Sequence, residues 1–140
     1  MKIIILPLFK KNMTEKSSKK VLLVDDDESL RQMYTLILNK AGYDLTTADD
    51  GIEGIAKIRE GGWDLILLDL MMPNLDGIGV LKAFQEEKGK CQTACPIVVL
   101  SNAGYNTVAK EAETLGAKGF LMKADLLPKD LIEALKKYLA

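Results

Sequence analysis

Five polar side chains follow the ends of short apolar runs in this 140-residue sequence. The runs are Val21–Val24, Leu65–Leu68, Ile97–Leu100 and Phe120–Met122. The side chains directly after them are Asp25 with Asp26, Asp69, Ser101 and Lys123. If the runs are strands of one parallel sheet, their carboxyl ends lie at the same edge, where open α/β sheets bind ligands. Three carboxylates, a hydroxyl and an ammonium group would then meet there.

Three neighbouring carboxylates repel one another, because each ionised group disfavours ionisation of the next. Lys123 is the one cation that the pattern brings to this edge. A hard divalent cation with oxygen ligands, most simply Mg2+, relieves the remaining repulsion. We therefore expect a magnesium site in which Asp25, Asp26 and Asp69 lie within a few ångströms of one another. Without metal, removal of one charge, as in Asp26→Asn, should stabilise the fold.

Each of these residues also has an ordinary structural interpretation. The acidic run from Asp25 to Glu28 could cap a helix, whose dipole favours negative charge at that end. Asp69 could cap a loop, Ser101 could occupy a turn, and Lys123 could be a solvated surface lysine. These explanations require four coincidences at four strand ends, whereas one shared site explains them together.

The apolar runs alternate with helical stripes along the chain. A further strand is expected at Leu45–Ala48, whose threonines suit a sheet edge. Apolar residues at helical spacing mark five helices: Leu30, Met33, Tyr34, Ile37, Leu38 and Ala41; Ile52, Ile55 and Ala56; Ile78, Leu81 and Phe84; Val108, Ala112 and Leu115; Leu131, Ile132, Leu135 and Leu139. Gly42 and Gly116 are expected to end the first and fourth helices, and Pro128 suits the first turn of the last. This alternation predicts an α/β fold with a parallel sheet covered on both faces.

Length, composition and charge restrict the class of protein. A mass of 15.4 kDa suits one domain, and the absence of histidine excludes a histidine-based catalytic triad. Residues 1–20 carry six Lys and one Glu, a net charge of +5, whereas residues 21–140 carry 13 basic and 19 acidic residues, a net charge of −6. An acidic domain is not expected to bind nucleic acid. The apolar run at residues 3–9 is too short to cross a membrane, so we expect a cytoplasmic protein without membrane attachment.

The beginning of the chain differs in composition from the rest. Residues 1–18 are typical of a flexible extension, and residues 19–140 of the folded domain. Residues 1–12 could be an upstream extension without function, or Ile3–Leu6 could dock as a strand or hydrophobic anchor. Because chain termini are usually loosely held, we favour the first interpretation and expect residues 1–12 to be dispensable.

Four motifs give the sequence a specific resemblance to one family. They are Val-Leu-Leu-Val-Asp-Asp-Asp from residue 21, Leu-Ile-Leu-Leu-Asp-Leu-Met-Met-Pro-Asn-Leu-Asp-Gly from residue 65, Ile-Val-Val-Leu-Ser from residue 97 and Gly-Ala-Lys-Gly-Phe-Leu-Met-Lys from residue 116. In these motifs residues 19–140 resemble a response-regulator receiver domain of the chemotaxis type. The resemblance implies a flavodoxin-like, doubly wound α/β fold, with a five-stranded parallel sheet in the order 2-1-3-4-5 and five helices.

The resemblance implies a Mg2+ site built from three side chains and one backbone group. Asp26 would bind the ion directly, and Asp25 would bind it through water. Asp69 and the backbone carbonyl of Met71 would complete the protein ligands. Because Mg2+ prefers oxygen ligands, this set agrees with the chemistry expected from the clustered carboxylates themselves.

The resemblance also makes Asp69 the phosphoacceptor. Its carboxylate would attack phosphorus and form a mixed anhydride, while Ser101 and Lys123 bind phosphoryl oxygens. The new group brings a charge of about −1.5 to −2 into the pocket. Ser101 would move toward this charge, and Phe120 would turn inward as the switch residue when Ser101 moves.

The implied function is a signalling switch of a two-component system or phosphorelay, not an enzyme in the usual sense. A sensor histidine kinase or a histidine phosphotransfer protein would supply the phosphoryl group. Output is expected through a further protein, because no output domain follows the last helix. A monomer or a weak, phosphorylation-dependent dimer is expected.

Two alternative functions remain open at this point. One is a Mg2+-dependent phosphohydrolase with an aspartate nucleophile, but such enzymes often carry a second acid where this chain has Met71. The other is a pseudo-receiver that binds partners without phosphorylation, and the intact acidic set argues against it.

Several features depart from the family pattern. Ala124 follows the lysine where the family usually has a proline in a cis bond. A cis bond before a non-proline residue costs about 2.5–4 kcal/mol, so either that cost persists or the loop differs. Asn102 replaces the usual small residue, and the segment 86–95 is long for a helix-to-strand link. Cys91 and Cys95 could oxidise together, but two reduced thiols are expected in the cytosol.

Overall fold

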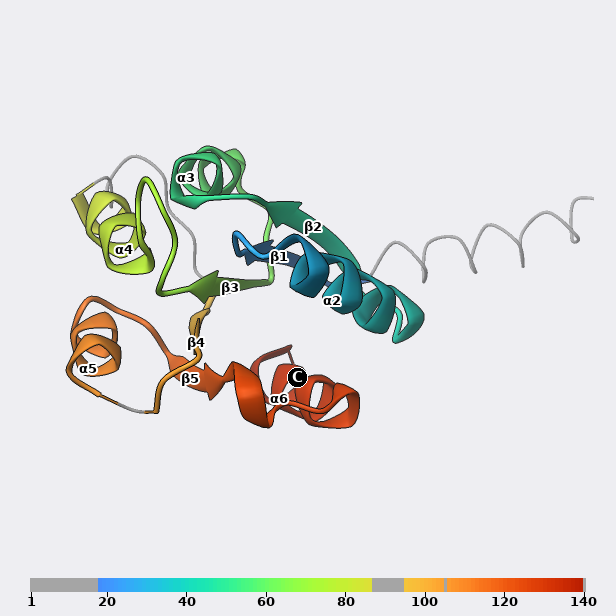
Figure 1. Cartoon of the computed structure of the whole chain (residues 1–140). Coiled ribbons are helices and arrows are strands. Elements are labelled where there is room, and N and C mark those ends of the chain that lie inside the picture. Colours follow the sequence, from blue (N-terminus) through green and yellow to red (C-terminus); the bar gives the residue numbers. More distant parts are fainter. Residues whose placement is uncertain (1–17, 87–94, 105, 140) are drawn as a thin grey trace, which may run out of the picture.

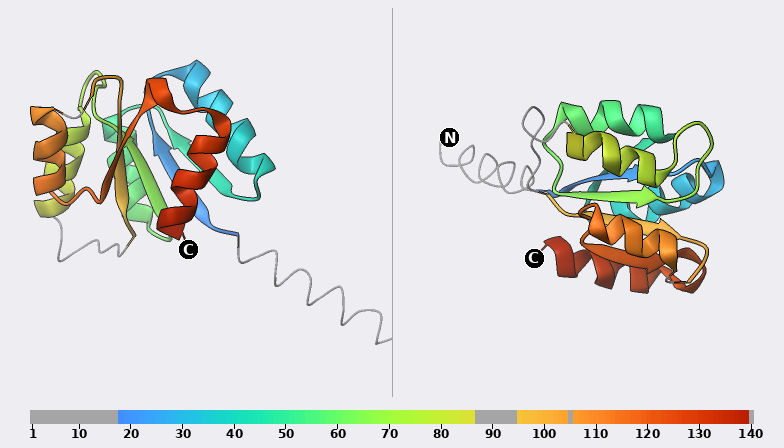
Figure 2. Two further views of the ribbon diagram at one scale, coloured as in Figure 1. Left: turned by 90° about the horizontal axis from the view of Figure 1, so that it is seen from below. Right: turned by 90° about the vertical axis from the view of Figure 1, so that its left-hand side faces the viewer.

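The sheet has five parallel strands, as expected. The computed structural model describes residues 18–86, 95–104 and 106–139. The strands are β1 (Lys20–Val24), β2 (Asp44–Ala48), β3 (Leu65–Asp69), β4 (Ile97–Ser101) and β5 (Gly119–Met122). Their order in the sheet is β2-β1-β3-β4-β5, which confirms the expected fold class and strand order (Figure 1). In the right-hand view of Figure 2 the strand arrowheads point to one side, away from the carboxyl end of the chain.

Five α-helices in the described residues cover the two faces of the sheet. They are α2 (Glu28–Lys40), α3 (Gly51–Glu60), α4 (Gly77–Glu86), α5 (Thr107–Thr114) and α6 (Pro128–Leu139). Helices α3, α4 and α5 contribute buried side chains to one core cluster, and α2 and α6 to the other. Figure 1 shows these two groups on opposite sides of the sheet. A short 3-10 turn, η1 (Lys123–Asp125), joins β5 to the loop before α6.

The central strands are continuous apolar runs because both of their faces are buried. In β1, Val21 and Leu23 pack toward α2 and α6, whereas Leu22 and Val24 pack toward α3, α4 and α5. All four side chains have no exposed surface. A strand between two helix layers therefore needs an apolar residue at every position rather than at every second one.

Three helix faces differ from those expected. Met33 in α2, Ile52 in α3 and Val108 in α5 are 45%, 62% and 37% exposed. In α3 the buried face is instead formed by Gly51, Gly54 and Ile58. A Cβ atom on Gly54 would lie 2.8 Å from a methyl carbon of Val24, so the absence of a side chain lets α3 approach β1. A search for large apolar residues at helical spacing therefore does not identify a buried helix face that packs through glycine.

Other sequence expectations concern the connections. Gly42 and Gly116 follow α2 and α5 with φ values of 95° and 113°, which a glycine tolerates and other residues rarely adopt. The described residues contain no cis peptide bond, so the Lys123–Ala124 bond is trans and the loop differs from the family pattern. None of the helices in the described ranges has the length and apolar character needed to cross a membrane.

Some expectations fall on residues outside the described ranges. The extension at residues 1–17, including the possible docking of Ile3–Leu6, and the segment 87–94 lie there. Cys91 belongs to the second of these segments. Cys95 is half-buried and packs against the core cluster beneath α3, α4 and α5.

Candidate functional site

The strand ends bring four of the expected residues to one edge of the sheet. Asp25 directly follows β1, and Asp69 is the last residue of β3. Ser101 ends β4, and Lys123 directly follows β5. The parallel register pairs Val24 with Leu68 and Asp69 with Leu100, so neighbouring strands reach this edge together.

The three carboxylates form one cluster. One oxygen atom from each of Asp25, Asp26 and Asp69 lies within 4.8 Å of the other two. This confirms the expected proximity of the three side chains. Asp25 has no exposed surface and Asp69 is 2% exposed, whereas Asp26 faces solvent. The repulsion within the cluster is therefore concentrated between the two buried groups.

Lys123 lies between the two buried carboxylates. Its Nζ atom is 2.8 Å from Asp25 Oδ2 and 3.1 Å from Asp69 Oδ2, and its side chain is 8% exposed. Burial alone would lower the pKa of Lys123, but the two carboxylates outweigh this effect and raise it. The amine therefore remains charged and neutralises part of the pocket.

Asp25 Oδ2 forms an ion pair with Lys123 but has no well-aligned hydrogen bond. The atom is buried, and despite its distance of 2.8 Å from Lys123 it accepts no hydrogen bond of satisfactory geometry. We therefore treat this contact as an ion pair. A buried carboxylate oxygen that lacks a hydrogen bond, next to two further carboxylates, is suited to a hard cation.

The environment of Asp69 disfavours its ionised form. Burial raises the pKa of Asp69 to about 6 from 3.8, and the charge of Asp25 acts in the same direction. Lys123 and the backbone N–H of Met71, which donates to Asp69 Oδ1 at 3.2 Å, oppose this shift only in part. At about pH 6 and below, a cation at this carboxylate therefore competes with a proton.

The acidic run after β1 combines a helix cap with the cluster. Asp27 is the N-cap of α2 and accepts a hydrogen bond from the backbone N–H of Leu30 at 3.1 Å. Its own N–H donates to Asp25 Oδ1 at 2.9 Å. The cap explains Asp27 but not Asp25 or Asp26, so both interpretations of the run apply, each to different residues.

Met71, Ser101 and Phe120 lie on, or shortly after, the strands β3, β4 and β5. Ser101 is 5% exposed, and its Oγ atom accepts a hydrogen bond from the N–H of Ala103 at 3.0 Å. Met71 is 70% exposed and contacts Asp69 through its backbone. Phe120 is half-buried on β5, where it pairs in register with Val99 of β4.

Gly77 shapes the loop between Asp69 and α4. A Cβ atom at this position would lie 2.5 Å from the carbonyl oxygen of Asp69 and 2.8 Å from the Cα atom of Leu70. The N–H of Gly77 donates to the carbonyl of Leu70 at 3.1 Å. Only glycine allows α4 to begin this close to the strand that carries Asp69.

A second cation adjoins the cluster and was missed in the sequence. Arg31 of α2 donates from Nη1 to the backbone carbonyl of Asp25 at 2.8 Å, and its Nε lies 3.4 Å from Asp49 Oδ1. The expectation that Lys123 is the one nearby cation is therefore wrong. The strand at residues 44–48 is also followed by two acidic residues, Asp49 and Asp50, but they do not indicate which arginine would contact them.

Comparisons with known proteins agree on one family. The response regulator receiver domain matches residues 21–136. The transcriptional regulatory protein ResD of Bacillus subtilis is 33% identical over 127 residues, which cover 91% of this chain and 50% of ResD. This chain spans about half the length of the curated relatives that it matches.

Solved structures show the same fold. The chemotaxis protein CheY4 of Vibrio cholerae superposes with a TM-score of 0.79 at 34% identity, covering 88% of this chain and 100% of CheY4. The response regulator protein TrrA of Thermotoga maritima, solved in complex with Mg2+ and BeF, has a TM-score of 0.72 at 27% identity. That comparison covers 86% of this chain and 99% of TrrA.

Proposed function

This chain belongs to the response regulator receiver domain family, a family of signalling proteins, and from this premise we propose that it is a phosphoacceptor switch. In this proposal Asp69 accepts a phosphoryl group from the phosphohistidine of a histidine kinase or a histidine phosphotransfer protein. The main support is the position of Asp69, which lies 2% exposed at the end of β3 beside two carboxylates and an ammonium group. Residues 19–140 form the receiver domain in this proposal.

The proposed reaction depends on Mg2+. Asp25, Asp26 and Asp69, with the backbone carbonyl of Met71, would hold the ion, and the position of one oxygen from each of the three carboxylates within 4.8 Å of the others supports this assignment. When bound, Mg2+ neutralises the clustered carboxylates and the charge that develops on the phosphoryl oxygens. Asp26 is proposed as a direct ligand and Asp25 as a ligand through water.

The chain's own residues position and stabilise the transferred group. An oxygen of Asp69 forms a bond to phosphorus as the bond from phosphorus to the donor's histidine nitrogen breaks. Lys123, which already lies 3.1 Å from Asp69, pairs with a phosphoryl oxygen. Ser101 Oγ accepts from Ala103, which leaves its own hydrogen to donate to a second phosphoryl oxygen.

Movement of Ser101 toward the phosphoryl group is proposed to carry the signal. Ser101 and Phe120 lie near the ends of the adjacent strands β4 and β5, and Phe120 is half-buried rather than fully enclosed. An inward turn of Phe120 would alter the surface that α5 and β5 present to a partner protein. No observation favours the phosphohydrolase alternative, because Met71 offers neither an acid nor a base two residues after Asp69.

Mass spectrometry tests the proposed function. Incubation of the protein with acetyl phosphate and Mg2+ should add a single phosphoryl group, and EDTA should prevent the addition. Hydroxylamine should remove the group, because it cleaves acyl phosphates and leaves phosphoserine intact. Absence of labelling with Mg2+, or a label that resists hydroxylamine, would contradict a phosphorylated aspartate.

The phosphorylated form is expected to be long-lived. Ala103 and Met71 are exposed beside the pocket, and neither has a polar group that could orient an attacking water. The variant Ala103→Glu should shorten the lifetime by about three- to tenfold, equivalent to roughly 0.7–1.4 kcal/mol in the barrier. Decay of the labelled protein after removal of acetyl phosphate measures this lifetime. Ala103→Gln controls for size, and equal decay rates in parent and Ala103→Glu would refute the expectation.

A further inference from the structure

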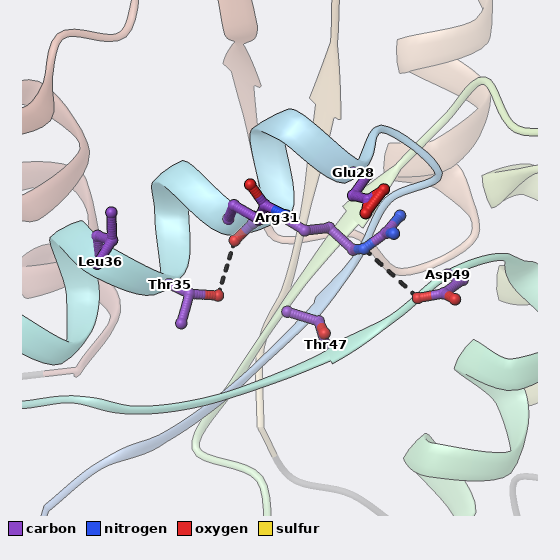
Figure 3. A pocket seen from close by; sticks show the side chains of 7 residues that line it. Glu28, Arg31, Thr35, Leu36, Thr47 and Asp49 are labelled. Carbon is purple, nitrogen blue, oxygen red and sulfur yellow. Dashed lines mark hydrogen bonds and ion pairs between the residues drawn. The ribbon is translucent and has the colours of Figure 1, made fainter.

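Arg31 extends across a groove between α2 and β2. The groove has a volume of about 570 Å3, and its lining includes Glu28, Arg31 and Thr47. Figure 3 shows the Arg31 side chain extending from α2 toward Asp49, which follows β2. The guanidinium therefore lies between the first helix of the domain and the edge strand, next to the turn that carries Asp25 and Asp26.

The contacts of Arg31 fix the backbone of Asp25. The N–H of Asp25 donates to the carbonyl of Ala48 in β2 at 3.1 Å, and its carbonyl accepts from Arg31 Nη1 at 2.8 Å. Arg31 Nε is in turn 3.4 Å from Asp49 Oδ1, and the N–H of Asp49 donates to Glu53 Oε1 at 2.7 Å. The N–H of Asp25 is thus bonded directly to β2. Its carbonyl is linked through Arg31 and Asp49 to Glu53 near the start of α3.

The ion pair by itself does not account for this arrangement. The Arg31 side chain is 15% exposed, whereas that of Asp49 is 67% exposed. An ion pair with such an exposed partner contributes little to stability because solvent screens it. The distinctive contact is the charge-assisted hydrogen bond from Arg31 to the carbonyl of Asp25, which belongs to the peptide group between Asp25 and Asp26.

We propose that Arg31 is a positioning residue for the metal site, and that Asp49 holds its guanidinium in place. Arg31 fixes the peptide of Asp25, and through it the angle at which Asp25 and Asp26 present their oxygens to Mg2+. This inference rests on the proposed Mg2+-dependent function. Removal of a contact that orients a metal ligand commonly changes metal affinity about 10–100-fold.

The direction of the effect distinguishes positioning from simple electrostatics. A cation beside a metal site repels Mg2+, so loss of the Arg31 charge alone should tighten Mg2+ binding. Loss of positioning should weaken it. Arg31→Lys keeps the charge but lacks the planar fork that reaches two acceptors, so it separates the two effects.

Isothermal titration with Mg2+ measures these variants. We expect Arg31→Lys to weaken Mg2+ binding about threefold or more and Arg31→Ala roughly tenfold. Lys40→Ala removes the same charge from the last turn of the same helix, and its Mg2+ affinity should match that of the parent. Because the defect concerns metal binding, excess Mg2+ should restore the rate of labelling by acetyl phosphate in both Arg31 variants.

A further pair of variants tests the role of Asp49. Asp49→Asn should weaken Mg2+ binding in the parent, and should have little effect when Arg31 is already lysine. If Asp49 acted through its charge alone, Asp49→Asn would weaken Mg2+ binding equally in the parent and in Arg31→Lys. That result would refute the proposed role of Asp49. The unfolding midpoint of each variant in EDTA shows whether the variant is folded. If Arg31→Ala does not fold, the Mg2+ affinity of Arg31→Lys decides the test.

The inference and the proposed function fail separately. If the parent protein does not bind Mg2+, the proposed function is wrong. If the parent binds Mg2+ and both Arg31 variants bind it equally well or more tightly, the proposed function stands and the positioning role of Arg31 is refuted.

Discussion

Asp69→Asn is expected to abolish phosphorylation by acetyl phosphate and to stabilise the metal-free protein at pH 7. Burial and the charge of Asp25 raise the pKa of Asp69 to about 6 from 3.8. This corresponds to roughly 3 kcal/mol that disfavours the ionised form in the folded state. Asparagine is uncharged, so the free energy of unfolding in EDTA should rise by up to that amount.

The stabilisation should depend on pH with a defined sign. Below about pH 4, Asp69 is protonated in both the folded and the unfolded chain, and the variant should show almost no gain. Between about pH 4 and 6 the unfolded chain loses its proton first, so the folded parent loses stability as the pH rises. Above about pH 6 the difference between variant and parent should become constant.

Urea unfolding at several pH values measures this effect. Trp63 is the sole tryptophan, and it is 8% exposed, so its fluorescence should report unfolding. Asp44→Asn, at the start of β2 and exposed, is the control and should change stability little at any pH. Phosphorylation of Asp69→Asn would contradict the phosphoacceptor assignment. If the variant were less stable than the parent at pH 7 in EDTA, the ionised Asp69 carboxylate would not be destabilising the folded protein.

Mg2+ should reduce the advantage of Asp69→Asn. At 100 times its dissociation constant, a ligand of the folded state stabilises it by about 2.7 kcal/mol, and the variant should gain less than the parent. From the sequence, stabilisation of the metal-free fold was expected for Asp26→Asn. Because Asp26 is exposed and Asp69 is buried, solvent screens the charge of Asp26 and the larger effect is now expected at Asp69.

Lys123→Met is expected to destabilise the metal-free protein by roughly 3–5 kcal/mol, because it leaves buried carboxylates without their cation. Asp25 has no exposed surface, and Lys123 is 2.8 Å from its Oδ2 atom. Methionine has a similar length, so packing should change less than charge. Chemical unfolding in EDTA at pH 7 measures the loss, and saturating Mg2+ should restore part of it.

Two control variants identify the cause of this loss. Lys82→Met removes an exposed lysine that lies 3.8 Å from Glu111, and should change stability by about 0.5 kcal/mol or less. Adding Asp25→Asn to Lys123→Met should recover stability, because it removes the unpaired charge. If Lys123→Met behaved like Lys82→Met, the lysine would not be neutralising the pocket.

The sequence predicted the sheet well because the physical constraint on each strand is strong. Strands between two helix layers must be apolar at every position, so β1, β3 and β4 are visible as uninterrupted runs. Helix faces carry a weaker signal. Exposed residues such as Met33 and Ile52 imitate a buried stripe, and Gly54 in α3 makes a buried contact without any apolar side chain.

The identity of the clustered residues was also predictable, since parallel strands end at a common edge. Asp25, Asp69, Ser101 and Lys123 could be found from their positions after apolar runs alone. Arg31 could not be found in this way, because it lies within a helix and reaches the cluster through a backbone carbonyl. No sequence pattern marks which carbonyl an arginine will contact.

The chain by itself therefore determines which charged groups meet, because strand order and direction bring specific residue types to one edge. Only the tertiary structure decides how those groups interact. Asp25 and Asp26 are adjacent and identical in type, yet one is fully buried and the other is exposed. Burial and distance decide that Lys123 bridges Asp25 and Asp69 and that the pKa of Asp69 rises to about 6. The physical reason is that desolvation and Coulomb energy depend on depth and separation in space, which residue type and spacing along the chain do not specify.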